Sequence, residues 1–328
     1  MKDYQQYGIT QRTMASMAKV VPSTINRYIL SNHFQPLPVS GIRNLRYSVD
    51  DSRKIISDLY RKNYTVTHPT LSFYNFKGGV GKTSMCYQIS THLAMMGYNV
   101  LAVDTDPQGH LSTSFGFNNS DSYFTLYDAI EEQIAIKDVI KPVFPGLDCI
   151  PSNLSLTRIE MALNMMPRRE ERVKIVLESV RGKYDYIIFD TNPTISNLNR
   201  NVITCSDLIN VVCETQPYSL NGLKLLLEDI HKFYHFMKID ASKILIIPNK
   251  YEDRMSSSAE AMTALREYYA DLMKADFAVR KSEEINTSAK MAIPLAFFSK
   301  VNSNALEDII ELLHHILKLT TQKYDVKI

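Results

Sequence analysis

The sequence predicts an α/β fold, in which helices flank a mostly parallel sheet and a small winged helix-turn-helix domain precedes it. The sheet is indicated by apolar runs of strand length, each followed by a polar turn or a helix: TLSFYNF, NVLAVDTD, YDYIIFDT, DLINVVCET and KILIIPNK. Because these runs are almost continuously hydrophobic, we expect strands that are covered on both faces, as in parallel sheets. A glycine-rich loop, KGGVGKT, follows the first run and precedes a helical pattern that closes at Gly97.

The chain is long enough for two domains, and the polar stretch NYTVTHPT is the expected boundary between them. The front domain then spans residues 1–66 and the large domain residues 67–328. Residues 1–70 carry ten Lys and Arg against four Asp and Glu, whereas the remainder carries 27 against 31. A basic front domain on a slightly acidic body indicates that the front contacts nucleic acid.

Two short helices are expected at the front, the first capped by Thr10 and the second restarting from Ser23 after a break at Pro22. The residues expected to face inward are Met14, Met17 and Ala18 in the first helix and Ile25, Ile29 and Leu30 in the second. This is the helix-turn-helix arrangement, whose second helix enters the major groove of DNA. The residues left to face base edges and phosphates are Thr24, Asn26 and Arg27.

The stretch PLPVSGIRNLRYSV predicts two short strands around Ser40-Gly41, a wing that carries Arg43 and Arg46. A helix capped by Asp50 or Asp51 is expected after it. This front segment resembles the winged-helix, MerR-like modules of bacterial regulators. The alternative is a small helical bundle that only packs against the large domain.

The loop at residues 77–83 has the features of a phosphate-binding site. The common pattern G-x-x-x-x-G-K-[ST] would need glycine at Phe76, and instead two lysines, Lys77 and Lys82, bracket the glycines. Backbone N–H groups and the start of the following helix favour phosphate at such a loop. Lys82 is expected to reach the β- and γ-phosphates, and Thr83 to offer its hydroxyl to Mg²⁺.

Carboxylates follow two other predicted strands, at the edge of the sheet where ligands bind in α/β folds. Asp190 ends YIIFD, and Asp104 and Asp106 end the strand that begins NVLAV. Asp190 is expected to orient Mg²⁺, and a carboxylate of the other pair to position an attacking water. Glu214 and Asn249 lie at the ends of further strands.

The motifs KGGVGKT, DTDPQG and IIFDTNP together resemble the deviant Walker A family of ParA and MinD ATPases, over roughly residues 70–320. The resemblance implies that Lys77 reaches across a dimer interface to the partner's nucleotide, so that ATP joins two subunits. It also implies ATP or ADP and Mg²⁺ as cofactors. The residues expected to bind nucleotide are Lys77, Gly78, Gly79, Val80, Gly81, Lys82, Thr83, Ser84 and, against adenine, Asn249.

By the same resemblance, the expected catalytic residues are Lys77, Lys82, Asp104, Asp106 and Asp190. Mg²⁺ is expected at Thr83, Asp104 and Asp190, partly through water, and Asp106 would position the attacking water. The sequence departs from the family pattern at Asn192, where D-x-P-P is usual, and at His110, where asparagine is frequent.

The form DPQG and the front domain favour a ParA protein over a MinD protein, which needs a membrane-seeking tail. The last predicted helix carries Glu307, Asp308 and Glu311 on its polar face, which an anionic membrane would repel. Its apolar residues are therefore expected to pack in the core: Leu306, Ile309, Ile310, Leu313, Ile316 and Leu317. The four cysteines show no C-x-x-C spacing and are expected to be buried thiols.

The resulting expectation is a plasmid-type partition ATPase, cytoplasmic and nucleoid-associated, with low intrinsic turnover. Its ATP-bound homodimer would bind non-specific DNA, with Arg280 and Lys281 as the favoured contacts, and a ParB-like centromere-binding partner would stimulate hydrolysis. The winged helix would bind operator DNA and repress the partition operon. The alternatives are a nucleotide-sensing repressor and a cargo-positioning ATPase of the same superfamily. Further candidate DNA contacts are Lys250, Arg254, Arg266, Lys290 and Lys300.

Overall fold

A seven-stranded sheet forms the centre of the large part of the chain. The computed structural model describes residues 4, 7–38, 45–118, 122–274, 276–300 and 302–323. The strand order is β10-β9-β4-β8-β5-β7-β6, parallel throughout except for β6, which pairs antiparallel with β7 at one edge. The strands are β4 (Thr70–Tyr74), β5 (Val100–Asp104), β6 (Lys141–Phe144), β7 (Leu147–Ile150), β8 (Tyr186–Asp190), β9 (Leu208–Glu214) and β10 (Lys243–Asn249). The predicted mostly parallel α/β sheet is thereby confirmed.

Side chains alternate between the two faces of this sheet, and both faces are covered. In β4, Leu71 and Phe73 join one hydrophobic cluster, whereas Tyr74 joins another on the opposite side. The first face is covered by α4 (Lys82–Met95), α5 (His110–Ser114), α13 (Glu283–Met291), α14 (Leu295–Phe298) and α15 (Asn304–Thr320). The second face is covered by α6 (Leu126–Ile130), α7 (Ile136–Val139), η3 (Leu154–Arg158), α8 (Ile159–Met165), α9 (Arg172–Arg181), α10 (Asn197–Cys205), α11 (Pro217–Met237), α12 (Ser256–Tyr269) and η4 (Ala270–Leu272).

The front segment contains the two predicted short helices. Its elements are β1 (Ile9–Thr10), α1 (Gln11–Ala18), α2 (Pro22–Ser31), β2 (Arg46–Tyr47) and α3 (Val49–Leu59). Thr10 caps α1 by accepting a hydrogen bond from the Thr13 N–H, as expected. Ile25 and Ile29 are buried, but the inward placement of Leu30 is wrong, because its side chain is 66% exposed. The helix buries one narrow face against α1 and α3, and Leu30 lies beside that face.

The segment after α2, where the sequence predicts a wing, is described only in part, and the wing stays a prediction. β2 pairs antiparallel with β1, which precedes α1, and Leu37 N–H donates to the Arg46 carbonyl (2.7 Å). Ser40, Gly41 and Arg43 lie outside the described residues. The cap of α3 is Ser48, whose hydroxyl oxygen accepts from the Asp51 N–H. The prediction of an aspartate cap is therefore wrong, and Asp50 and Asp51 occupy the first helical turn, where acidic groups favour the helix dipole.

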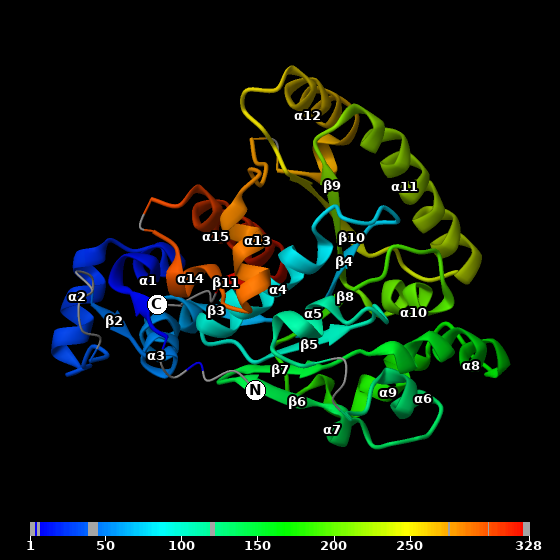
Figure 1. Ribbon diagram of the computed structural model, residues 1–328, viewed down its shortest axis with the longest axis horizontal. Coiled ribbons are helices and arrows are strands. Elements are labelled where there is room, and N and C mark those ends of the chain that lie inside the picture. Colours follow the sequence, from blue (N-terminus) through cyan, green and yellow to red (C-terminus); the bar gives the residue numbers. More distant parts are fainter. Residues whose placement is uncertain are drawn as a thin grey trace.

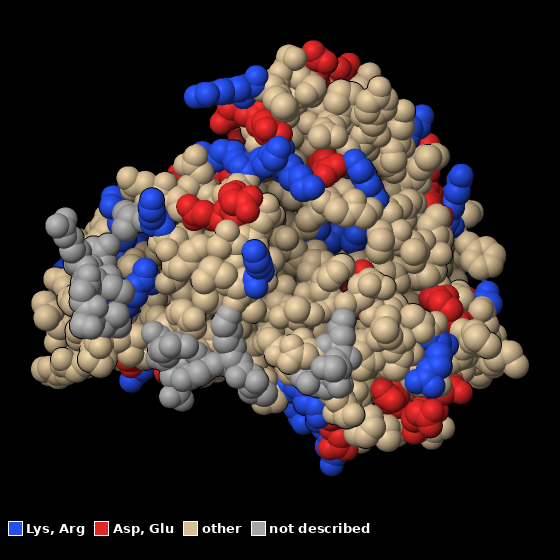
Figure 2. Space-filling view, viewed as in Figure 1, with Lys and Arg blue, Asp and Glu red and all other residues tan. Residues whose placement is uncertain are grey.

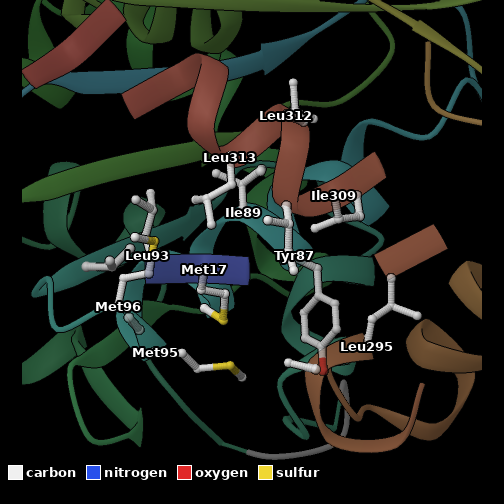
Figure 3. Packing of buried hydrophobic residues seen from close by; sticks show 14 of the residues in the cluster. Met17, Tyr87, Ile89, Leu93, Met95, Met96, Leu295, Ile309, Leu312 and Leu313 are labelled. Atoms are coloured by element: carbon white, nitrogen blue, oxygen red, sulfur yellow. The ribbon is translucent and has the colours of Figure 1, made fainter. Parts of the chain in front are cut away.

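The front segment packs directly on the large part of the chain. Met17 of α1 inserts among side chains of α4 and α15, including Leu93 and Leu313 (Figure 3). The two parts are linked by η2 (Arg61–Asn63) and β3 (Tyr64–Val66). β3 pairs with β11 (Thr321–Lys323), next to α15 (Figure 1). One hydrophobic cluster therefore runs through both predicted domains, and the boundary at residues 66–67 stays a prediction.

The last helix, α15, packs as expected, since all six of its predicted core residues are buried. All four cysteines are buried free thiols, also as expected. In the described part of the chain, none of the helices has the length and apolarity needed to cross a membrane.

Candidate nucleotide-binding site

The glycine loop connects β4 to α4, as the sequence predicts. Gly79 and Gly81 have φ angles of +75° and +101°, which favour glycine. A Cβ on Gly81 would lie 2.3 Å from Nδ2 of Asn249, so the loop approaches β10 too closely for any side chain. Residues 82 and 83 open α4, and the first N–H groups of a helix have no partner within it. The loop therefore has the backbone form of an anion-binding turn.

Two asparagines hold the loop from neighbouring strand ends. Asn75 accepts from the Lys77 N–H (2.9 Å) and donates to the Val212 carbonyl of β9 (2.7 Å). Asn249, at the end of β10, donates to the Val80 carbonyl (2.7 Å). These bonds fix the path of the backbone before any ligand is considered. The adenine contact expected of Asn249 stays a prediction.

Lys82 is buried at the start of α4, with its side chain beneath the loop. Its Nζ donates to the Lys77 carbonyl (3.2 Å), and the residue is only 6% exposed. Burial lowers the pKa of Lys82, while the carboxylates of Asp190 and Asp106 act in the opposite direction. The ammonium group therefore faces the acidic strand ends, where the charge of a phosphate would strengthen its protonated form.

Lys77, at the front of the loop, is held by a carboxylate of the same chain. Its Nζ lies 2.5 Å from Oε2 of Glu214, the last residue of β9. The other carboxylate oxygen accepts from Lys250 Nζ (2.7 Å), which also donates to the Gly79 carbonyl (2.6 Å). Lys250 was expected among the DNA contacts, but the structure places its ammonium on the loop instead.

Asp104 is fully buried at the end of β5, and both of its carboxylate oxygens accept hydrogen bonds. Oδ1 accepts from the Asp106 N–H (3.0 Å), and Oδ2 accepts from both the N–H (2.8 Å) and the hydroxyl (2.7 Å) of Ser112. Burial raises the pKa of Asp104 to about 6, although these hydrogen bonds favour the charged form. Asp104 thus fixes the turn that carries Asp106, and Asp106 in turn accepts from the Gln108 N–H (2.9 Å).

Asp190 ends β8 directly beside Asp104 in the strand register. It is fully buried, and neither carboxylate oxygen accepts a hydrogen bond of ordinary geometry from the residues that the structure describes. Its pKa lies far above the ordinary value, first because of burial and then because of the charge on Asp104. Two neighbouring buried carboxylates, one of them unpaired, fit a divalent cation, which prefers oxygen ligands. Thr83 and Ser84 lie half-buried in the first turn of α4.

The segment after Asp190, where the sequence departs from the family pattern, is held by side-chain amides. The Oδ1 of Asn192 accepts from the Thr194 hydroxyl (2.6 Å) and from Asn199 Nδ2 (2.8 Å) of α10. Asn199 Nδ2 also donates to the Asn192 and Thr194 carbonyls. Asn192 thereby joins this segment to α10, a contact that a proline at this position could not make.

The expected DNA-contacting residues are placed very differently from one another. Asn26 and Arg27 are exposed on α2 and Thr24 is half-buried, so the outward face of that helix is available. Arg46 does not face outward from a wing, because its Nη1 donates to the carbonyls of Gly8 (2.8 Å) and Phe297 (2.5 Å). Burial lowers its pKa. Arg46 therefore fastens the front segment to α14.

Two other expected DNA contacts take part in ion pairs. Arg280 is bound by Asp308 (2.5 Å) and Glu307 (3.1 Å) of α15, which raise its pKa, and Lys281 pairs with Glu252 (3.0 Å). In the upper middle of Figure 2, where α13 and α15 lie, basic and acidic side chains accordingly alternate. Arg280 is thus engaged by α15 and 30% exposed, whereas Lys281 is 61% exposed, and DNA contact by either residue stays a prediction.

Comparison with known proteins agrees with this geometry. A family model described as an AAA domain matches residues 68–243. The cell division protein PomZ of Myxococcus xanthus is 29% identical over 83% of this chain and 85% of its own. The chromosome partitioning protein ParA of Caulobacter vibrioides is 32% identical over 61% of this chain and 76% of its own.

Solved structures share the fold. The ATP complex of a Cyanothece McdA variant superposes with a TM-score of 0.69 and 22% identity, covering 76% of this chain and 96% of that one. A putative plasmid partition protein of Borrelia burgdorferi bound to AMPPNP has a TM-score of 0.63 and 23% identity, over 76% of this chain and 99% of that one. Because the family model covers more than half of the chain and the ParA relative aligns over most of its own length, the chain belongs to the ParA/MinD superfamily of ATPases.

Proposed function

We propose that the chain is a ParA-type ATPase for DNA segregation, in which Mg²⁺-ATP joins two subunits and hydrolysis separates them. The observation that supports this most is the pairing of the two-lysine loop with buried, unpaired Asp190 at the adjacent strand end. A loop alone would bind phosphate. A divalent cation would stabilise the ionised form of the buried carboxyl beside it, and ATP is bound as its Mg²⁺ complex in such sites.

Each part of the site would then have one task. Backbone N–H groups of residues 78–84, with Lys82, would hold the phosphates, and Mg²⁺ would be held by Thr83, Asp104 and Asp190, partly through water. The metal would neutralise charge on the phosphates. Asp106, held by the turn that Asp104 fixes, would orient the attacking water. Low turnover without a partner is expected, because this positioning depends on a complete dimer.

The DNA-related part of the proposal rests on the front segment and on the partition proteins among the relatives. The exposed face of α2, with Thr24, Asn26 and Arg27, would contact operator DNA, and Arg43 stays a candidate on sequence alone. Lys281 is the retained candidate for non-specific DNA in the ATP-bound dimer, which would place the protein on the nucleoid. A ParB-like centromere-binding protein would stimulate hydrolysis.

Molar mass by light scattering tests the dimer. We would compare ADP, ATP with Mg²⁺, and ATP with a chelator, on the wild type and on Lys77→Ala. The expected result is a doubled mass only with Mg²⁺-ATP, lost in Lys77→Ala. A matched control is Lys281→Ala, which leaves the loop intact. A mass that does not respond to nucleotide, together with an unaltered ATPase rate in Lys77→Ala, would refute the sandwich.

A second candidate is the cargo-positioning ATPase of the same superfamily. It is supported by the PomZ relative, which is named for cell division and not for partitioning, and which aligns over a larger share of this chain than the ParA relative does. The two functions differ in what stimulates the ATPase. Centromere DNA with its cognate binding protein should do so for segregation, and a protein complex without centromere DNA should do so for cargo positioning. A nucleotide-sensing repressor would instead keep its biological activity in Asp106→Ala.

A further inference from the structure

The carboxylate of Glu214 joins two lysines of the nucleotide site. It accepts from Lys77 at 2.5 Å and from Lys250 at 2.7 Å, one lysine on each oxygen. Its side chain is 10% exposed, whereas those of Lys77 and Lys250 are 48% and 43% exposed. Burial alone would raise the pKa of Glu214, but the hydrogen bonds from Lys250 and Lys77 outweigh it and keep the pKa below its ordinary value. The carboxylate is thus a largely buried negative charge that is paired with two more exposed ammonium groups.

The two lysines are not held alike. Lys250 has a second bond, from Nζ to the Gly79 carbonyl (2.6 Å), and it directly follows Asn249, whose amide donates to Val80. The Nζ of Lys77 has Glu214 as its partner in the described part of the chain. Breaking an ion pair costs most free energy when it leaves a buried charge unpaired. If Lys77 moves away, Glu214 still pairs with Lys250, so this cost does not arise.

We propose that Glu214 is a positioning residue that retains Lys77 on its own subunit and releases it when the ATP-bound dimer forms. This inference rests on the proposed function, since it assumes that Lys77 contacts the partner's nucleotide. The exchange replaces a single carboxylate partner by a polyphosphate, which carries more charge. Glu214 thereby sets the affinity of the dimer, and Lys250 lowers the free-energy cost of releasing Lys77.

The first experiment tests whether Glu214 retains Lys77 in the protein before any dimer forms. The full-length protein, without nucleotide, is treated with an amine-acylating reagent, and the modification of Lys77 is followed by mass spectrometry. In Glu214→Gln, Lys77 should react about 3- to 5-fold faster than in the wild type, the range expected for loss of a partly exposed ion pair. Glu252→Gln is the matched control, because it removes the partner of Lys281 and should leave Lys77 unchanged. An equal rate in Glu214→Gln overturns the inference.

The release is tested by the dimer dissociation constant, measured by sedimentation with Mg²⁺ and a non-hydrolysable ATP analogue. Glu214→Gln should tighten the dimer by about 3- to 5-fold. In a Lys77→Ala background the same change should have no effect, which a purely structural role would not predict. A dimer that is unchanged or weakened, with ADP affinity intact, contradicts the inference.

Two further outcomes are informative. If both Glu214→Gln and Glu214→Asp lose ADP affinity, Glu214 builds the loop and does not position Lys77, and the inference is wrong. If the wild type forms no dimer with the analogue, the proposed function fails and the release fails with it. The acylation rates still decide whether Glu214 holds Lys77, so the two failures are distinguishable.

Discussion

His92, in the middle of α4, gives a prediction whose size follows from its surroundings. The ring is fully buried, its Nδ1 donates to the Gln88 carbonyl (2.7 Å), and its Nε2 has no partner in the described part of the chain. A proton added to Nε2 would place a charge in the core without an acceptor. Burial accordingly lowers the pKa of His92 to about 4.

The sign and size of the pH effect follow by linkage. The unfolded state has a histidine pKa of about 6.5, so between about pH 6.5 and 4 it binds a proton that the folded state does not. The contribution of the neutral His92 ring to the free energy of unfolding is therefore fully present above about pH 6.5 and is lost as the pH falls toward 4. The loss attributable to His92 is small at pH 7 and about 2 kcal/mol at pH 5.

The measurement is urea unfolding of the wild type and His92→Asn at pH 7 and pH 5. Asparagine keeps an N–H donor near the Gln88 carbonyl but does not titrate. Any cost of its smaller volume is the same at both pH values and cancels in the difference. Between pH 7 and 5 the variant should lose about 2 kcal/mol less than the wild type. His33→Asn, at an exposed position with φ of +57°, is the control and should follow the wild type. Equal losses in His92→Asn and wild type would refute the reasoning.

Three further predictions concern the loop, the packing of the front segment and the acidic strand end. Gly81→Ala should lower ADP affinity at least about tenfold in a fluorescence titration, because its Cβ would meet Asn249. The control is Gly222→Ala in α11, which has open space around it and should raise the free energy of unfolding by up to about 1 kcal/mol. Met17→Ala should lower that free energy by about 2–4 kcal/mol in urea, and a loss under about 1 kcal/mol would mean that α1 is not part of the core. Asp190→Asn should raise the thermal midpoint, because it removes a buried carboxyl whose ionisation burial opposes, and it should abolish Mg²⁺-dependent ATP hydrolysis. A lower midpoint would contradict the electrostatic account.

The sheet and the loop could be predicted because their signals are local. Each buried strand is a short apolar run, and the glycines, Lys82 and Thr83 lie within one turn of chain between a strand and a helix. The placement of Asp104 and Asp190 followed from one general rule, that parallel strands end at a common edge. Ser48 as the cap of α3 was also readable, since Ser-x-x-Asp is a capping pattern that the prediction overlooked.

The partners of the functional side chains could not be predicted, because they come from distant parts of the chain. Arg46 meets Phe297, 251 positions away, and Lys77 meets Glu214, 137 positions away. Nothing in the sequence near Arg46 distinguishes a wing arginine from one that fastens two segments together. Ser112, which engages Asp104, is likewise an ordinary residue of a short helix until the fold brings the two together.

The position of α1 has a consequence for the order in which the chain is assembled during synthesis. Met17 leaves the ribosome about 300 residues before Leu313 of α15, which packs near it. At about 5–20 residues per second this is a delay of roughly 15–60 s. α1 is therefore translated long before the helix that completes its packing. Until α15 arrives, the apolar face of α1 has only α4 and its own neighbours to cover it, so the nascent protein offers a binding surface to chaperones that the finished one does not.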